Sequence, residues 1–381
     1  MNTTKKLKIG ILLRNRHDGP GGLEKVLEVL SSGIQKKPVE LYFYGLLQPK
    51  YKDFTKKFQK ITYLTLPKSI KKISSKLPAS ISRIIEKIYV KQSGYQLFDT
   101  MIKDDIDVLI IMDLSSQFLK NYKFLCYLKK HSKIKLLSWI HISLTGSKNK
   151  VAQQVKQKMK VFDGHLAISK GLAVELQNDY NAQNISLIYN PIDSAKIIPR
   201  DKTKFIYIGR ITKIKRVDSL LNQLSQLNGN WSLDIYGSTG NENSDIEFKN
   251  LITHLNLTKK VSFHGWQKDA WSKIDNAGIL LLNSTREGFG LVIVEAMQRG
   301  IPVLASDCPV GPAELIHHGT NGWLYPIDAE YQIKDILQSI LDGSTELPDP
   351  LLIQNSVQQY ETQSYLNNFI EKINSYIIEN K

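Results

Sequence analysis

Short apolar runs alternate with segments of helical periodicity along the whole chain, and this alternation limits the possible folds more than any other feature. A parallel sheet buries both of its faces, so its strands read as short apolar runs, each followed by a crossover helix. The expected strands are 8–13, 39–44, 61–66, 108–112, 136–140, 166–169 and 186–189, and then 205–209, 233–236, 261–264, 279–282 and 303–306. The pattern therefore predicts an α/β protein with doubly wound parallel sheets.

The alternation is interrupted at the turn-rich sequence Asn190-Pro191-Ile192-Asp193. A chain of 381 residues exceeds what one hydrophobic core usually supports. We therefore expect two Rossmann-like domains, 1–192 and 193–359, that face each other across a cleft. The remaining segment, 360–381, carries an apolar helical stripe that must pack on another part of the chain.

The net charge of +15 is concentrated in the first half of the chain. Residues 1–190 hold 33 Lys and Arg against 14 Asp and Glu, whereas residues 191–381 hold 18 against 22. Such asymmetry indicates that the first half faces a polyanion: nucleic acid, an anionic membrane or an acidic polymer. Nucleic acid is disfavoured, because neither a recognition motif nor interleaved stacking aromatics accompany the charge.

No targeting signal or membrane span is recognisable. The apolar run 9–13 is too short for a signal peptide, and the runs 108–112 and 279–282 fall far below the ~20 residues of a spanning helix. Two cysteines, Cys126 and Cys308, cannot form a disulfide framework. We expect a cytoplasmic protein, with peripheral contact to the inner face of the cell membrane as an open alternative.

The segment 67–92 combines apolar residues at helical spacing with surrounding cations, and Pro78 divides it into two expected short helices. The cations expected to form a membrane or polyanion surface are Lys68, Lys71, Lys72, Lys76, Arg83 and Lys87. Two interpretations stay open: a helix pair packed on its domain, or an amphipathic anchor in the plane of an anionic membrane.

Two loops that follow expected strands carry groups suited to anions. Gly21 and Gly22 follow the first strand and open a helix, whose free amides can bind an anion. Arg210 directly follows the strand 205–209, and Lys215 lies five residues further on. Ligands of α/β sheets bind beyond the carboxyl ends of the strands, where these cations can hold phosphate.

The strongest motif spans 283–297, where a strand leads into a glycine-containing loop and then a helix. Glu287 lies in the loop, and Glu295 lies eight residues later in the helix. Amides near Phe289 can hold phosphate, while the two carboxylates can accept hydrogen bonds from sugar hydroxyls.

These motifs, in this order, resemble the family 4 retaining glycosyltransferases, which have the GT-B fold. Glu287 and Glu295 match the family's pair of glutamates, and the resemblance covers nearly the whole chain. The segments 139–143, 188–191 and 264–267 are most similar to the branch of lipopolysaccharide 1,6-galactosyltransferases and related cell-surface polymer enzymes. The fold implies an N-terminal acceptor domain, completed by the helix 360–381, and a C-terminal domain that binds a nucleotide sugar.

The resemblance implies a role for each matched carboxylate and cation. Glu295 would hold the ribose hydroxyls of the nucleotide, and Glu287 would bind the donor hexose. Arg210 and Lys215 would neutralise the diphosphate, and His141 would lie beside the donor sugar near the reacting centre. We count His141, Arg210, Lys215 and Glu287 as the expected catalytic residues.

The other expected donor-binding residues would contact the donor mainly through backbone groups. They are Gly21, Gly22, Gly265, Trp266, Gly288, Phe289, Gly290 and Leu291. Ile214 and Arg216 depart from the family, which often has Glu before the lysine and Gly after it. Arg216 either adds charge opposite the phosphates or alters the nucleotide fit.

The resemblance implies a retaining hexosyltransferase that moves glucose, galactose or N-acetylglucosamine from a UDP-sugar by front-face attack. The acceptor would be an anionic cell-surface glycan, a teichoic-type polymer or a lipid-linked sugar. No cofactor besides the co-substrate and no metal are expected, because Arg210 and Lys215 can stabilise the leaving diphosphate. The alternatives are a non-catalytic partner subunit of the same fold and a nucleotide-sugar epimerase.

Two patterns resemble metal sites only superficially. Asp105-Ile106-Asp107 lies just before a buried strand, at the wrong end for a cleft. His317-His318 lacks further ligands at suitable spacing.

Overall fold

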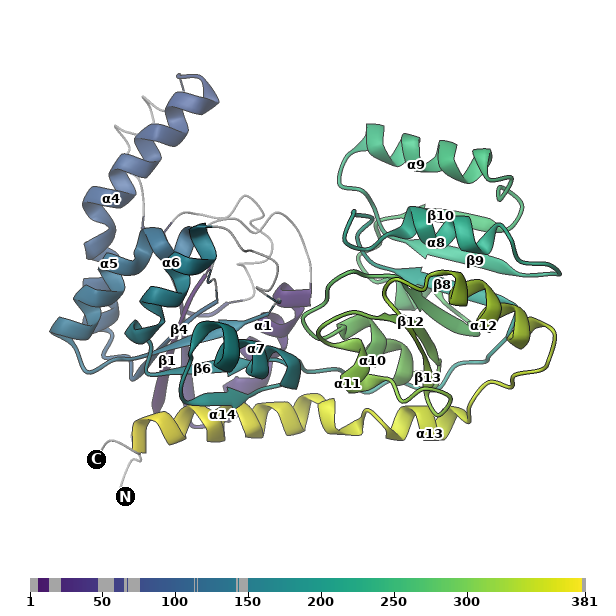
Figure 1. Cartoon of the computed structure of the whole chain (residues 1–381). Helices are drawn as coiled ribbons and strands as arrows, with labels where there is room; N and C mark the ends of the chain where they lie inside the picture. Colours follow the sequence, from purple (N-terminus) through teal and green to yellow (C-terminus); the bar gives the residue numbers. More distant parts are fainter. Residues whose placement is uncertain are drawn as a thin grey trace. The chain divides into compact units, whose positions relative to one another are not determined.

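The structure, a computed structural model, describes residues 6–13, 22–46, 58–64, 67, 76–112, 114, 116–141, 143 and 150–378. Contacts divide the chain into two units (Figure 1). Unit 1 comprises residues 1–168, 172–188 and 366–381, and unit 2 comprises 169–171 and 189–365. The chain enters unit 2 four residues before the expected boundary at 192, and residues 360–365 belong to unit 2 rather than to unit 1.

Unit 1 is built on a parallel sheet with the strand order β3-β2-β1-β4-β5-β6-β7. Its strands are β1 Leu7–Leu12, β2 Val39–Gly45, β3 Ile61–Tyr63, β4 Val108–Ile111, β5 Lys135–Ile140, β6 Gly164–Ala167 and β7 Ile185–Leu187. Every residue of β4 is buried, as expected for a central strand covered on both faces by helices. The strand order reverses between β1 and β4.

The helices of unit 1 lie in the expected crossovers. They are α1 Gly22–Gly33, η1 Ile34–Lys36, α4 Ala79–Lys103, α5 Ser116–His131, α6 Lys150–Lys158, η2 Met159–Val161, α7 Lys170–Tyr180 and most of α14 Thr362–Ile378. Pro78 immediately precedes α4, as expected of a helix breaker, but the helix runs on to Lys103 instead of ending near residue 92.

The first half of α4 extends beyond the sheet and the neighbouring helices of unit 1 (Figure 1). Ile81, Ile84 and Ile88 are 43–53% exposed there, whereas Leu97, Phe98 and Met101 in the second half are buried. The stripe of isoleucines therefore does not pack on the described part of its own unit. Residues 68–75, including Lys68, Lys71 and Lys72, lie outside the described residues, as do the side chains of Arg83 and Lys87.

α14 supplies the missing partner for the C-terminal apolar stripe. Leu366, Phe369 and Ile373 are buried, and the ring of Phe369 lies 5.6 Å from that of Trp139 on β5. Two glycines make room for the helix: a Cβ atom would lie 2.4 Å from Leu366 at Gly33 and 2.1 Å from the Tyr376 ring at Gly164. The helix is thus an integral part of the unit 1 core.

Unit 2 repeats the architecture with the strand order β10-β9-β8-β11-β12-β13, again entirely parallel. Its strands are β8 Lys204–Ile208, β9 Ser232–Tyr236, β10 Val261–Gly265, β11 Ile279–Leu282, β12 Val303–Asp307 and β13 Gly322–Pro326. Its helices are α8 Val217–Leu224, α9 Glu242–His254, η3 Trp271–Lys273, α10 Leu291–Met297, α11 Pro312–Leu315, α12 Tyr331–Leu341, α13 Pro350–Asn355 and η4 Gln358–Tyr360. The two parallel sheets confirm the expected fold class, while β13 is an additional edge strand that the sequence pattern did not predict.

The strand order of unit 2 reverses between β8 and β11. At such a switch point the loops after the two neighbouring strands diverge to opposite faces and leave a crevice for ligands. The loop 209–216 follows β8, and the loop 283–290 follows β11. The expected phosphate-binding and sugar-binding residues of unit 2 therefore lie at the same edge of its sheet.

Candidate functional site

Lys215 and Glu287 meet at the switch point of unit 2. The Lys215 Nζ atom lies 2.5 Å from Oε1 of Glu287, and the two side chains are only 20% and 11% exposed. An ammonium group keeps further donors after one hydrogen bond, so Lys215 retains donors beyond its bond to Glu287. The structure thus brings together the two residues that the sequence placed on separate loops.

The loop 283–290 is shaped by its glycine and by a buried ring. Gly290 has φ +92°, a left-handed conformation that favours glycine, and it precedes the first turn of α10. A Cβ atom at this position would also approach the Ile293 side chain to 2.7 Å. Phe289 is buried, and its ring lies 5.3 Å from that of Tyr360, so it anchors the loop in unit 2.

Glu295 lies on α10 and is oriented by a tryptophan that the sequence did not indicate. The Trp271 Nε1–H donates to Oε2 of Glu295 at 3.0 Å, and the Arg299 guanidinium lies 4.3 Å from the centre of the Trp271 ring. Arg299 in turn donates to the Glu295 carbonyl. Burial lowers the pKa of the Arg299 guanidinium, while Glu295 opposes that shift.

The residues at the expected base-binding loop form an aromatic group. Tyr236 and His264 stack at 4.6 Å, and Nε2 of His264 lies 2.6 Å from Oδ1 of Asp234. Gly265 has φ +69°, and Trp266 directly after it is 50% exposed. This loop thus presents a large apolar ring at the carboxyl end of β10.

The Arg216 side chain is held by contacts within unit 2. Its guanidinium donates to Asn283 and to the Ile327 carbonyl, and it forms an ion pair with Glu330. Of the two roles considered for Arg216, additional charge opposite the phosphates is therefore not supported. Arg210 is exposed, and its carbonyl accepts a hydrogen bond from the buried Tyr207 hydroxyl.

Cys308 lies close enough to the Lys215–Glu287 pair for both charges to influence it. Burial, followed by the charge of Glu287, raises the pKa of its thiol to about 11. The thiol is therefore protonated at neutral pH and is a poor nucleophile, so we assign it no chemical step.

The remaining expected site residues lie in unit 1 or outside the described residues. Gly22 is the first residue of α1, and His141 follows β5, with its ring 4.7 Å from that of Trp139. Both therefore occupy the carboxyl-end side of their sheet. Gly21 lies outside the described residues.

The two superficial metal patterns have other contacts. Asp107 accepts a hydrogen bond from the Lys8 amide at the beginning of the sheet, and His318 contacts the Leu324 backbone through Nδ1. Within the described ranges, no three His, Cys, Asp or Glu side chains are grouped closely enough to hold a metal ion.

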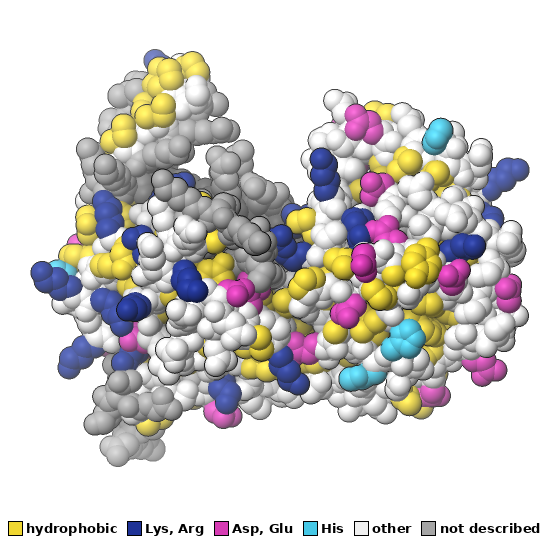
Figure 2. Space-filling model, in the orientation of Figure 1, with side chains coloured by type: hydrophobic (Ala, Val, Ile, Leu, Met, Phe, Trp, Pro, Cys, Tyr) yellow, Lys and Arg dark blue, Asp and Glu magenta, His cyan; other side chains and the backbone are white. Residues whose placement is uncertain are grey.

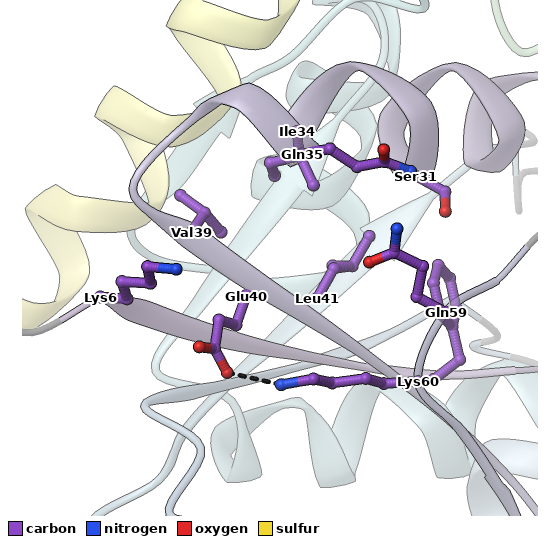
Figure 3. Close-up of a pocket in the computed structure, with 10 residues that line it drawn as sticks. Lys6, Ser31, Ile34, Gln35, Val39, Glu40, Leu41, Gln59 and Lys60 are labelled. Carbon is purple, nitrogen blue, oxygen red and sulfur yellow. Dashed lines mark hydrogen bonds and ion pairs between the residues drawn. The ribbon is translucent and has the colours of Figure 1, made fainter.

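A cavity of about 340 Å³ in unit 1 lies at the opposite, amino-terminal edge of the sheet (Figure 3). Its lining includes Ser31, Gln35 and Leu41, together with the ion pair between Glu40 and Lys60 at 2.6 Å. The hydrogen bond from Lys60 holds the pKa of Glu40 below its usual value. The lining residues lie near the beginnings of β1, β2 and β3 and not at the carboxyl ends of the strands, so we assign the cavity no part in the site.

Known proteins are similar to this chain in sequence and in fold. Residues 190–351 match the family described as Glycosyl transferases group 1. The lipopolysaccharide 1,6-galactosyltransferase of Salmonella typhimurium is 32% identical over 277 residues, which cover 69% of this chain and 73% of that protein. The poly(ribitol-phosphate) alpha-N-acetylglucosaminyltransferase of Staphylococcus aureus is 24% identical, over 73% of this chain and 57% of that protein.

Two solved structures have the same fold over almost the entire chain. The apo form of the lipopolysaccharide outer core galactosyltransferase WaaB superposes with a TM-score of 0.74 at 25% identity, covering 97% of this chain and 99% of that one. Anabaena Alr3699/HepE, solved in complex with UDP, superposes with a TM-score of 0.72 at 16% identity, covering 97% of this chain and 100% of that one.

Proposed function

This chain belongs to the group 1 glycosyl transferases, and on that premise we propose that it transfers a hexose from a UDP-sugar to an anionic cell-surface acceptor with retention of configuration. The hexose is of the glucose, galactose or N-acetylglucosamine type. The observation that carries the proposal is the Lys215–Glu287 pair at the switch point of unit 2, with Glu295 oriented nearby on α10.

In the proposed reaction, Glu295 accepts hydrogen bonds from the ribose hydroxyls, and Glu287 accepts them from the hexose, with the amides of Phe289 and Gly290. Lys215 and Arg210 hold the diphosphate, whose negative charge grows as the bond to the anomeric carbon breaks. Fixed cations at that point stabilise the transition state more than the ground state. We assign this stabilisation to the two cations and propose that transfer needs no metal.

Retention follows if the acceptor hydroxyl attacks the anomeric carbon from the side on which the diphosphate departs. The bond from the acceptor oxygen to the anomeric carbon forms as the bond to the diphosphate oxygen breaks. The leaving phosphate oxygen then takes the acceptor proton, so the reaction needs no separate protein base. We place His141 beside the donor sugar in this scheme.

The acceptor side of the proposal rests on charge. The basic excess lies in residues 1–190, and Lys and Arg side chains are spread over the visible face of unit 1 (Figure 2). One relative is named for acting on poly(ribitol-phosphate), which is an anionic polymer, and another for acting on lipopolysaccharide. We propose that unit 1 binds an acceptor of this kind at the inner face of the membrane. Among the described helices, none has the length and apolar character needed to span a membrane.

Slow hydrolysis of the donor tests the proposal without knowledge of the acceptor. UDP- and GDP-hexoses are incubated with the protein, and the released nucleotide is measured. We expect UDP release from one UDP-hexose, and a loss of at least 100-fold in Lys215→Ala and Glu295→Ala, with unchanged circular dichroism. Activity should survive EDTA.

Three outcomes would each contradict a different part of the proposal. Wild-type rates in both variants would overturn the site assignment. Loss of activity in EDTA with recovery in Mn²⁺ would overturn the metal-free mechanism. Conversion of the sugar to its epimer without UDP release would point to an epimerase instead.

A further inference from the structure

Arg216 has an unusual backbone for its residue type. It has φ +46° and ψ +44°, a left-handed conformation seldom adopted by residues other than glycine, and it stands directly before α8. The side chain is 20% exposed. Such a backbone conformation costs free energy in an arginine, and the contacts of its side chain can compensate for that cost.

The contacts of Arg216 converge on the segment that leads into the Glu287 loop. Nε donates to the Asn283 carbonyl at 3.0 Å, and Nη2 donates to the Asn283 side-chain oxygen at 2.9 Å. The Asn283 side-chain Nδ2 returns a hydrogen bond to the Arg216 carbonyl at 3.2 Å. The planar guanidinium is suited to such a two-pronged contact, whereas an ammonium group is not.

Neighbouring bonds tie the same two loops and leave Asn283 little freedom. The Thr285 amide donates to the Ile214 carbonyl at 2.7 Å, one residue before Lys215. The buried Tyr325 hydroxyl donates to the Asn283 side-chain oxygen at 2.7 Å. Lys215 and Glu287 therefore extend from two loops that are joined on either side of the lysine.

The charge of Arg216 is already neutralised. Glu330 pairs with it, and Ser219 donates to the same carboxylate. The donors of the guanidinium are engaged by Asn283, Ile327 and Glu330. We therefore expect Arg216 to influence the site by holding the backbone of the two loops, and not by the electrostatic effect of its charge.

We propose that Arg216 is a positioning residue that fixes Lys215 opposite Glu287 by joining the loop 212–216 to the end of β11. The proposal rests on the proposed function only for the part that Lys215 plays. The left-handed backbone turns the side chains of two consecutive residues to different partners: Lys215 to Glu287, and Arg216 to Asn283.

The first test is a double-mutant cycle read by donor hydrolysis. Arg216→Gly removes the guanidinium but suits the left-handed backbone, so it isolates the side-chain contacts. We expect it to lower kcat at least tenfold while the KM for the UDP-sugar changes less than threefold, because Glu295 still holds the nucleotide. In a Lys215→Ala background the same change should cost less than twofold, since Arg216 acts through Lys215.

Two further variants keep the cycle interpretable. Arg216→Lys retains the charge opposite Glu330 but loses the planar guanidinium that contacts Asn283 twice. We expect its kcat to stay at least fivefold below that of the wild type. Arg200→Lys is the matched control, because Arg200 also donates to a backbone carbonyl, that of Pro348, but it precedes β8 and so lies at the amino ends of the strands. It should lower stability comparably and leave kcat unchanged.

A second readout does not depend on catalysis. Acetylation of the Lys215 amine by acetic anhydride, followed by mass spectrometry, should accelerate at least threefold in Arg216→Gly and not in Arg200→Lys. Faster labelling in a protein that hydrolyses no UDP-sugar would uphold the positioning role and reject the proposed function. Unchanged labelling, unchanged kcat in Arg216→Gly, or additive losses in the double variant would overturn the inference.

Discussion

Glu295 illustrates how a site residue depends on a neighbour that ordinary pattern reading passes over. Trp271 lies in the short helix η3, 24 residues before its partner, and donates a single hydrogen bond to the Glu295 carboxylate. Arg299 lies against the indole ring and keeps it in place. One oxygen of Glu295 is thereby oriented by the protein, which pre-organises the carboxylate for the ribose hydroxyls of the proposed donor.

Trp271→Phe removes this donor while keeping an apolar ring under Arg299. A hydrogen bond to a charged group contributes about 1.5 kcal/mol or more, so we expect the KM for the UDP-sugar to rise about tenfold. Because Glu295 holds the nucleotide in ground and transition state alike, kcat should change less than twofold. Steady-state hydrolysis measures both constants. Trp231→Phe makes the same replacement in the core of unit 2 and should leave KM unchanged; an equal rise there would refute a specific role for Trp271.

At this scale the sequence indicated the charged candidates for the site but not the side chains that contact them. Glu287, Glu295 and Lys215 stand out because charged residues follow apolar strands in glycine-containing loops. Trp271 and Asn283 carry no charge that would draw attention in the sequence, and their partners lie 24 and 67 residues away. Such pairings are fixed by the register of the sheet and by helix packing, which a single sequence does not encode in any local pattern.

Strands β5 and β6 are joined by a buried polar pair in addition to their backbone ladder. The Ser138 hydroxyl lies 2.7 Å from Nδ1 of His165, and both residues are almost completely buried. Burial lowers the pKa of His165 to about 4. The imidazole is therefore neutral in the folded unit across the whole neutral and mildly acidic range.

This shift predicts a pH dependence for the stability of unit 1. The unfolded chain binds a proton at His165 below its ordinary pKa of about 6.5, whereas the folded unit does not until the pH approaches 4. The stabilisation is thus complete above pH 6.5 and is lost as the pH falls toward 4, by up to about 3 kcal/mol. Hydrogen exchange of the β5 and β6 amides at stepped pH measures the effect.

His165→Gln is the control for this prediction, because it keeps a polar partner for Ser138 without a titrating group. The variant should have lower stability at neutral pH but a flatter dependence between pH 6.5 and 4. Parallel profiles for the two proteins would show that other groups cause the acid sensitivity of this region.

The elements that the sequence failed to predict have local physical explanations. β13 is bounded by Gly322 and Pro326, residues that usually mark turns, and it forms only because an edge strand tolerates proline. α4 exceeds its expected end because residues 93–103 pack their apolar side chains on unit 1, whereas the isoleucines of its first half face away. Both halves of α4 have helical periodicity, so the sequence does not show that their apolar side chains lie on different faces of the helix.

At the scale of the whole molecule, unit 1 combines the basic excess of residues 1–190 with a stripe of exposed isoleucines on α4. The isoleucine stripe of α4 appears as hydrophobic atoms along the projecting end of the helix (Figure 2). By helical geometry this stripe lies roughly 120° around the axis from the side chains that pack on the unit. We therefore predict that the outer face contacts an anionic membrane surface.

Vesicle binding tests this prediction. Replacing Ile81, Ile84 and Ile88 with Ser should reduce binding to anionic vesicles at least fivefold, and replacing Lys68, Lys71, Lys72 and Lys76 with Gln should reduce both the binding and its salt dependence. Donor hydrolysis should stay unchanged in both. Ile246→Ser, which removes an equally exposed residue from unit 2, is the control. Undiminished binding in both variants would mean that the charge serves only solubility.

The position of α14 also determines the order in which the chain can fold during synthesis. Unit 1 contains residues from the beginning of the chain, yet Phe369 and Ile373 fill its core against Trp139. A ribosome completes residues 189–365 before these side chains emerge. Unit 1 is therefore synthesised first but completed last. Unit 2 can form its core while the α14 binding surface of unit 1 is still exposed. A nascent chain arrested before residue 366 should accordingly expose that surface to chaperones, although its two sheets are already encoded.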